Sequence, residues 1–257
     1  MKSEELLQAA KDACFDRAVE MVYVCESGSR AWGFASSDSD YDVRFFFKQP
    51  VMEYVRIGTP VEYLQKTSGV LDVVGWDIRK ALGLLRKSNC SAVEWLFSPV
   101  VYREYSAYIN QLRNVMREGA DLTAMQHHYR GMAMKHVKRY LVSDRVSLKK
   151  YLYILRGLMC CHWMRLYQTI PPVWVPDLEA LYPPGFQELL DLKKGRTSEG
   201  PSRETSEKDT MRRNPDLDRY IGEQLAIEPV RFQYHDLCGP LNEILEAELM
   251  RGRDGLI

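Results

Sequence analysis

Two short β-rich runs, separated by a turn of small residues and a polar loop, constrain the fold of this chain most strongly. The first run spans residues 19–25 and the second spans residues 40–47. Residues 3–17, which precede them, carry apolar side chains at helical spacing. Residues 61–65 and 70–76, which follow them, are predicted to form a hairpin. The first hundred residues therefore alternate helix and strand, which predicts a mixed sheet.

The rest of the chain has a different pattern, in which helical spacing predominates and strand signals are few. The predicted helices span residues 104–118, 123–142, 147–168, 177–194 and 240–251. Residues 195–215 are polar and almost free of apolar side chains, so they are predicted to form a mobile loop. The predicted fold class is α+β, with an α/β domain over residues 1–103 and a helical domain over residues 104–257.

Composition limits the class of protein and its location. The chain has 35 Lys and Arg residues and 35 Asp and Glu residues, so no global basic field indicates nucleic-acid binding, although a local patch remains possible. The six cysteines are scattered and form no CxxC pair, which is typical of a reducing compartment. The first residues do not resemble a signal peptide, and no apolar run approaches the ~20 residues that cross a bilayer. We expect a soluble cytoplasmic protein without membrane association.

The second strand carries the residues that indicate chemistry. Asp40 and Asp42 lie two positions apart, so their side chains are predicted to share one strand face with Arg44, while the intervening residues face a core. Two neighbouring carboxylates repel each other unless a cation lies between them. Mg²⁺ or Mn²⁺, which prefer oxygen ligands, are the natural occupants.

The small-residue turn between the two strands is predicted to bind phosphate. Gly28 allows a sharp turn and a close backbone approach, and Ser29 adds a hydroxyl. A helix that starts near Arg30 would direct free N–H groups at a phosphate. Each half alone is more simply interpreted as a common turn, but the two halves in this order favour displacement of pyrophosphate from a nucleoside triphosphate.

A Gly-Ser turn followed by an Asp-x-Asp pair on the next strand resembles the signature of the DNA polymerase β-like nucleotidyltransferase superfamily. Residues 28–33 and 39–44 are similar to the RNA repair pathway polymerase-β-like family, RlaP. Further similar stretches lie at residues 75–82, 94–99 and 149–156. The resemblance covers residues 20–165 and implies a mixed-sheet nucleotidyltransferase palm domain followed by an all-helical domain.

The resemblance also implies a third metal-binding carboxylate, which accepts the proton of the attacking hydroxyl. Asp72 lies within an apolar strand, where a lone carboxylate is costly unless a metal or partner neutralises it. Asp77 is the alternative, but it also suits the N-cap of a helix. We favour Asp72.

The third predicted helix of the second domain carries a cationic stripe. Lys149, Tyr153 and Arg156 follow at i, i+4 and i+7, and Lys150 is an alternative to Lys149. The resemblance implies that such a helix helps bind the triphosphate or the acceptor, while a solvated basic face is the alternative interpretation. Arg44 is predicted either to meet a phosphate or to balance the charge of the aspartates.

The predicted function is a metal-dependent transfer of a nucleoside monophosphate from a nucleoside triphosphate, such as ATP, to an acceptor hydroxyl. Asp40, Asp42 and Asp72 would bind Mg²⁺ or Mn²⁺, and Gly28 and Ser29 would bind the β- and γ-phosphates. The resemblance favours an RNA 3′ end as the acceptor. Transfer to a protein or small molecule, as in toxin–antitoxin or antibiotic-modifying relatives, is one alternative. A non-catalytic nucleotide- or RNA-binding module is another.

Overall fold

The computed structural model describes residues 1–14, 17–104, 106–195 and 210–250. These residues form two compact units, of which the first takes residues from 1–31, 40–120 and 234–257, and the second from 32–39 and 121–233. Residues 32–39 of the second unit thus fall, along the chain, between the Gly28-Ser29 turn and Asp40. The domain boundary near residue 103 stays a prediction.

The first unit is built on a five-stranded sheet in the order β3-β4-β2-β1-β5. Its strands are β1 (Glu20–Glu26), β2 (Tyr41–Lys48), β3 (Tyr63–Ser68), β4 (Leu71–Asp77) and β5 (Val101–Glu104). β2 and β4 run parallel, whereas the other three neighbouring pairs are antiparallel. This arrangement confirms the predicted α+β class with a mixed sheet.

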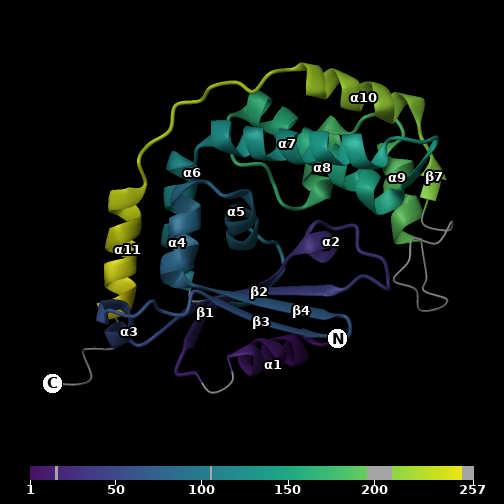
Figure 1. Cartoon of the computed structure of the whole chain (residues 1–257). Helices are drawn as coiled ribbons and strands as arrows, with labels where there is room; N and C mark the ends of the chain where they lie inside the picture. The colour runs from purple at the N-terminus through teal and green to yellow at the C-terminus, as the bar shows by residue number, and fades with distance from the viewer. Residues whose placement is uncertain (15–16, 105, 196–209, 251–257) are drawn as a thin grey trace. The chain divides into compact units, whose positions relative to one another are not determined.

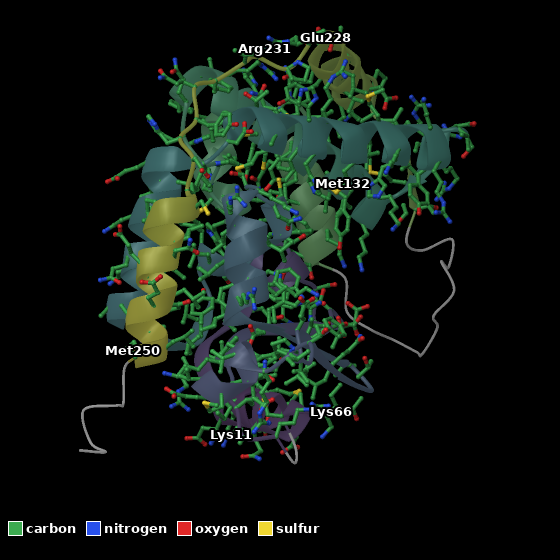
Figure 2. The ribbon with its side chains drawn as sticks, turned by 60° about the vertical axis from the view of Figure 1, so that its left-hand side comes forward. Lys11, Lys66, Met132, Glu228, Arg231 and Met250 are labelled. Atoms are coloured by element: carbon green, nitrogen blue, oxygen red, sulfur yellow. The ribbon has the colours of Figure 1, made fainter. Side chains whose placement is uncertain are left out.

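Helices cover both faces of this sheet. The helices of the first unit are α1 (Ser3–Ala13), α2 (Gly28–Ala31), α3 (Val51–Val55), α4 (Ile78–Arg86), α5 (Cys90–Leu96), α6 (Ser106–Gly119) and α11 (Cys238–Met250). Figure 1 shows α1 on one side of the sheet and α4 and α5 on the other. Lys11 and Lys66, labelled in Figure 2, mark the region where α1 runs beside β3, and Lys66 Nζ lies 3.3 Å from Asp12 Oδ2.

The two faces of β2 carry different side chains, as its alternating sequence predicts. Val43, Phe45 and Phe47 are fully buried in a core shared with α1. Phe46 points to the opposite face, where its ring stacks 5.9 Å from that of Trp95 in α5. Asp42, the acidic residue of β2, shares this second face.

In the first unit, side-chain caps fix the starts of α4 and α5. Asp77, the predicted cap, accepts a hydrogen bond of 2.9 Å from the backbone N–H of Arg79 and so starts α4. Asn89 accepts one of 3.2 Å from Ala92 N–H and starts α5. The first of these confirms the predicted helix start after β4.

The second unit is mostly helical. It contains α7 (Leu122–Tyr140), β6 (Arg145–Ser147), α8 (Leu148–Tyr167), the 3₁₀ helix η1 (Val175–Leu181), α9 (Phe186–Lys194), β7 (Thr210–Arg212) and α10 (Pro215–Ala226). The largely buried α8 packs against α7, η1, α9 and α10. Residues 227–233, marked by Glu228 and Arg231 in Figure 2, return along α7, where Phe232 N–H donates to Thr123 Oγ1.

Several predicted bounds differ from the structure. The helix predicted over 177–194 is two helices, because Pro183 and Pro184 cannot continue a helical ladder and Gly185 has a φ of +85°. The domain predicted as all-helical contains a two-stranded sheet, since β7 pairs with β6. Residues 210–212 of the predicted mobile loop therefore form a strand, and residues 196–209 of that loop lie outside the described residues.

Candidate active site

Two of the predicted carboxylates lie side by side in the sheet. Asp42 of β2 and Asp72 of β4 are register partners in the parallel pair. Facing residues of neighbouring strands point to the same side, about 4.8 Å apart. The side chain of Asp42 is 29% exposed and that of Asp72 is 33% exposed. The apolar neighbours of Asp72 in the sequence suggested that it is buried, and the structure shows that it is not. The sheet thus presents two neighbouring carboxylates at a partly open surface.

Arg44 holds the two carboxylates together. Its Nη2 atom lies 3.0 Å from Asp42 Oδ1 and 2.7 Å from Asp72 Oδ2. Its Nη1 atom donates to the backbone oxygens of Asp72, at 2.7 Å, and of Val43, at 3.1 Å. The sequence of β4 implied that the Asp72 carboxylate needs a partner, and Arg44 is that partner. Arg44 was predicted either to contact a phosphate or to balance the charge of the aspartates, and in this structure it forms ion pairs with Asp42 and Asp72.

Asp40 lies apart from this pair, just before β2 begins. It is exposed, and its backbone oxygen accepts a hydrogen bond of 3.1 Å from Arg30 Nε. Among the described residues, no group of three or more His, Cys, Asp or Glu side chains is close enough to bind one metal ion. The structure therefore brings Asp42 and Asp72 together and leaves Asp40 outside their group.

The predicted turn contacts this pair directly. Gly28 has a φ of +61°, and a Cβ atom built on it would lie 2.1 Å from Asp42 Oδ2. Ser27 N–H donates a hydrogen bond of 2.9 Å to Asp42 O, which fixes the turn to the start of β2. Glycine is required here both by the backbone conformation and by the carboxylate that occupies the space of its missing side chain.

The residues after Gly28 form a single helical turn. α2 begins at Gly28, two residues earlier than predicted, and Ser29 is half-buried in it. The guanidinium of Arg30 lies 3.8 Å from the ring centroid of Tyr41, in addition to its bond to the Asp40 oxygen. These contacts tie α2 to the first residues of β2.

Glu26 is a site residue that the sequence analysis did not single out. It is fully buried at the end of β1, and its Oε1 accepts a hydrogen bond of 2.7 Å from Asp42 N–H. Its Oε2 accepts a short hydrogen bond from the hydroxyl of Tyr102. Burial raises the pKa of the Glu26 carboxyl, although both hydrogen bonds oppose the rise. An acidic residue that ends an apolar run directly before the turn is the signal that marks it.

Asp77, the alternative third carboxylate, is occupied by structural contacts. Besides capping α4, it accepts hydrogen bonds of 3.0 Å from Gln49 Nε2 and 2.7 Å from the hydroxyl of Tyr54. It is 2% exposed, and burial raises its pKa. Its register partner on β2 is Phe47 rather than an acidic residue.

The predicted cationic stripe of α8 borders aromatic rings of the second unit. Lys149 Nζ and Lys150 Nζ both lie 5.8 Å from the ring centroid of Tyr153. Arg156 is buried, with its guanidinium 4.2 Å from the ring of Trp32. In the described part of the chain, neither lysine forms an ion pair with a carboxylate. The rings of Trp32 and Tyr153 lie 5.0 Å apart, so the three predicted cations border one aromatic pair, and both lysine alternatives reach it.

His136 of α7 belongs to the same group. Its ring stacks 6.3 Å from that of Tyr153. Burial, followed by the nearby charges of Lys150 and Arg139, lowers the pKa of its imidazole. An imidazole with a lowered pKa is neutral near pH 7, so the positive charge of this group comes from the lysine and arginine side chains.

The carboxylate pair suits a divalent cation in its chemistry. Both side chains offer oxygen ligands, and Asp42 Oδ1 and Asp72 Oδ2 both lie within 3.0 Å of the cationic nitrogen Arg44 Nη2.

No helix among the described residues is long and apolar enough to cross a membrane.

The chain is similar to a known protein family over most of its length. The family model of the RNA repair pathway DNA polymerase beta family, RlaP, matches residues 2–236. A Bacillus subtilis (strain 168) protein described as uncharacterized protein YcgL is 43% identical over 156 residues, which are 60% of each chain. The chain thus spans less than two thirds of that relative. The crystal structure of a nucleotidyltransferase-like protein from Exiguobacterium sibiricum 255-15 is 14% identical, with a TM-score of 0.32 over 99% of this chain and 78% of the other.

Proposed function

Because the chain belongs to the RNA repair pathway DNA polymerase beta family, we propose that it is a metal-dependent nucleotidyltransferase that acts on RNA. Family membership supports a nucleotidyltransferase of the polymerase β type. The finer proposal is transfer of a nucleoside monophosphate from a nucleoside triphosphate such as ATP to an RNA 3′ hydroxyl, with release of pyrophosphate. The observation that carries it is the Asp42–Asp72 pair packed against Gly28.

The proposed metal ligands are Asp42 and Asp72, which the sheet brings together, and Asp40, which lies just before β2. A bound Mg²⁺ or Mn²⁺ would neutralise the phosphate charge that develops during transfer. Asp72 would also accept the proton of the attacking hydroxyl at a carboxylate oxygen. Its partly exposed side chain suits this role better than the buried, fully hydrogen-bonded Asp77.

The proposed phosphate ligands come from two parts of the chain. Gly28 and Ser29 would bind the β- and γ-phosphates through backbone N–H groups at the start of α2, with Arg30 and Arg44 supplying positive charge. Lys149, Lys150, Tyr153 and Arg156 of α8 are proposed to bind the triphosphate or the acceptor. Lysines without an ion pair among the described residues suit a polyanionic ligand.

A labelling assay tests this function. The protein is incubated with one α-labelled nucleoside triphosphate at a time, with Mg²⁺ or Mn²⁺ and pooled RNA. We expect labelled RNA with the wild type and at least about a hundredfold less with Asp42→Asn or Asp72→Asn, since both remove charge at the reacting phosphate. Asp12→Asn is the matched control, because it removes an exposed carboxylate on α1 away from this pair.

The alternative functions give other outcomes. Labelled protein or a labelled small molecule, without labelled RNA, would indicate a different acceptor. Absence of metal-dependent incorporation with every nucleotide would indicate a binding module. Equal labelling by the wild type and both aspartate variants would contradict the proposed role of the pair.

A further inference from the structure

Arg44 occupies the place between the two carboxylates that a metal ion is expected to take. One nitrogen, Nη2, contacts both Asp42 and Asp72, and the arginine side chain is only 13% exposed. The second nitrogen is anchored on the backbone oxygens of Asp72 and Val43. The guanidinium is therefore fixed in position by four hydrogen bonds.

The geometry of the two cations differs. Arg44 holds the carboxylate oxygens at 3.0 and 2.7 Å from its nitrogen, whereas Mg²⁺ requires oxygen ligands at about 2.0–2.1 Å. A metal bound to the same two oxygens would lie where Nη2 now lies, at repulsive distance from the guanidinium. One cation must leave before the other binds.

We propose that Arg44 is a competing internal cation, which stabilises the carboxylate pair without metal and must be displaced when a divalent ion binds. This inference rests on the proposed function, because it assumes that Asp42 and Asp72 are the metal ligands. If Arg44 competes, the protein binds the metal ion more weakly than the two carboxylates would bind it without Arg44. The displaced guanidinium becomes available to a second anion, such as the phosphates of a nucleotide.

Mn²⁺ binding without nucleotide, measured by the electron paramagnetic resonance signal of free Mn²⁺, tests the competition. We expect Arg44→Met to bind Mn²⁺ about tenfold to a hundredfold more tightly than the wild type, the equivalent of one charge-assisted hydrogen bond. Arg44→Lys keeps a competing charge but loses the planar guanidinium that makes these four bonds, so its Mn²⁺ affinity should lie between those of the wild type and Arg44→Met. The melting temperature of each variant without metal reports whether it is folded.

The outcomes separate the competition from the metal site itself. If Asp42→Asn abolishes Mn²⁺ binding but Arg44→Met binds no more tightly than the wild type, the metal site stands and the competition is wrong. If Asp42→Asn leaves the Mn²⁺ affinity unchanged, the metal is not bound at this pair, and the proposed function loses its support together with the competition.

A measurement on the wild type covers the case in which Arg44→Met does not fold. The side-chain N–H resonance of Arg44, identified by its absence from Arg44→Lys, is followed by NMR during titration with Mg²⁺. Displacement predicts that this resonance shifts or broadens as the site fills. A resonance unchanged at saturating Mg²⁺ would overturn the proposal.

Discussion

Substitution of Gly28 by alanine probes the contact on which the candidate site depends. Two separate costs apply at this position. The φ of +61° disfavours any side chain, at about 1–2 kcal/mol. The new methyl group would also lie 2.1 Å from Asp42 Oδ2, so the carboxylate must rotate away.

Rotation of the Asp42 carboxylate breaks its contact with Arg44, since the two oxygens move as one rigid group. That contact is a charge-assisted hydrogen bond at a site less than one third exposed, worth about 1.5–3 kcal/mol. We expect Gly28→Ala to lower the free energy of unfolding by about 2.5–5 kcal/mol in total, the sum of these two costs. A displaced carboxylate should also lower nucleotide incorporation by about a hundredfold.

Gly69 supplies a matched control for the backbone cost. It lies in the turn between β3 and β4 with a φ of +57°, and a Cβ atom there meets nothing within 4 Å. Gly69→Ala should therefore cost only about 1–2 kcal/mol and leave incorporation unchanged. Urea unfolding and the labelling assay compare the two variants. Equal losses of stability with full activity in both would refute the claim that Asp42 fills the space beside Gly28.

Three further predictions concern stability and charge. Because burial raises the pKa of Glu26, its carboxyl favours the protonated form in the folded state, and the wild type should lose stability as pH rises above about 4.3. Glu26→Gln should lose less stability over the same pH range. Urea unfolding over a pH series measures this, and an unchanged pH dependence would contradict it. Asp77→Ala should cost about 2–4 kcal/mol through loss of a helix cap and two buried hydrogen bonds, yet leave Mn²⁺ affinity unchanged; lost Mn²⁺ binding in a folded variant would make Asp77 a ligand. Lys150→Ala should raise the pKa of His136, measured by NMR titration, whereas Lys149→Ala should not; equal effects would contradict the arrangement of α8.

Local sequence was sufficient for features that depend on neighbouring residues. The two faces of β2 follow from the alternation of side chains along any strand, so the core position of Val43, between Asp42 and Arg44, was predictable. The cap at Asp77 likewise depends only on a carboxylate and the N–H groups that follow it. Short elements such as β6 and β7 were missed, because three residues carry too little periodicity to distinguish a strand from a loop.

Only the tertiary structure decided how the acidic residues meet. Asp42 faces Asp72 because β2 pairs with β4 in one particular register, and register between strands 30 residues apart depends on packing of the whole sheet. The same packing turns Arg44 back onto both carboxylates and buries Glu26 behind Asp42.

The sequence by itself thus predicted candidate ligands for a cation and a phosphate, since residue type and strand alternation are local properties. It did not determine that Arg44 lies between the carboxylates, or that Gly28 is glycine because Asp42 occupies its side-chain space. Those contacts join segments that come together only when the sheet has formed, and their distances follow from its register and twist.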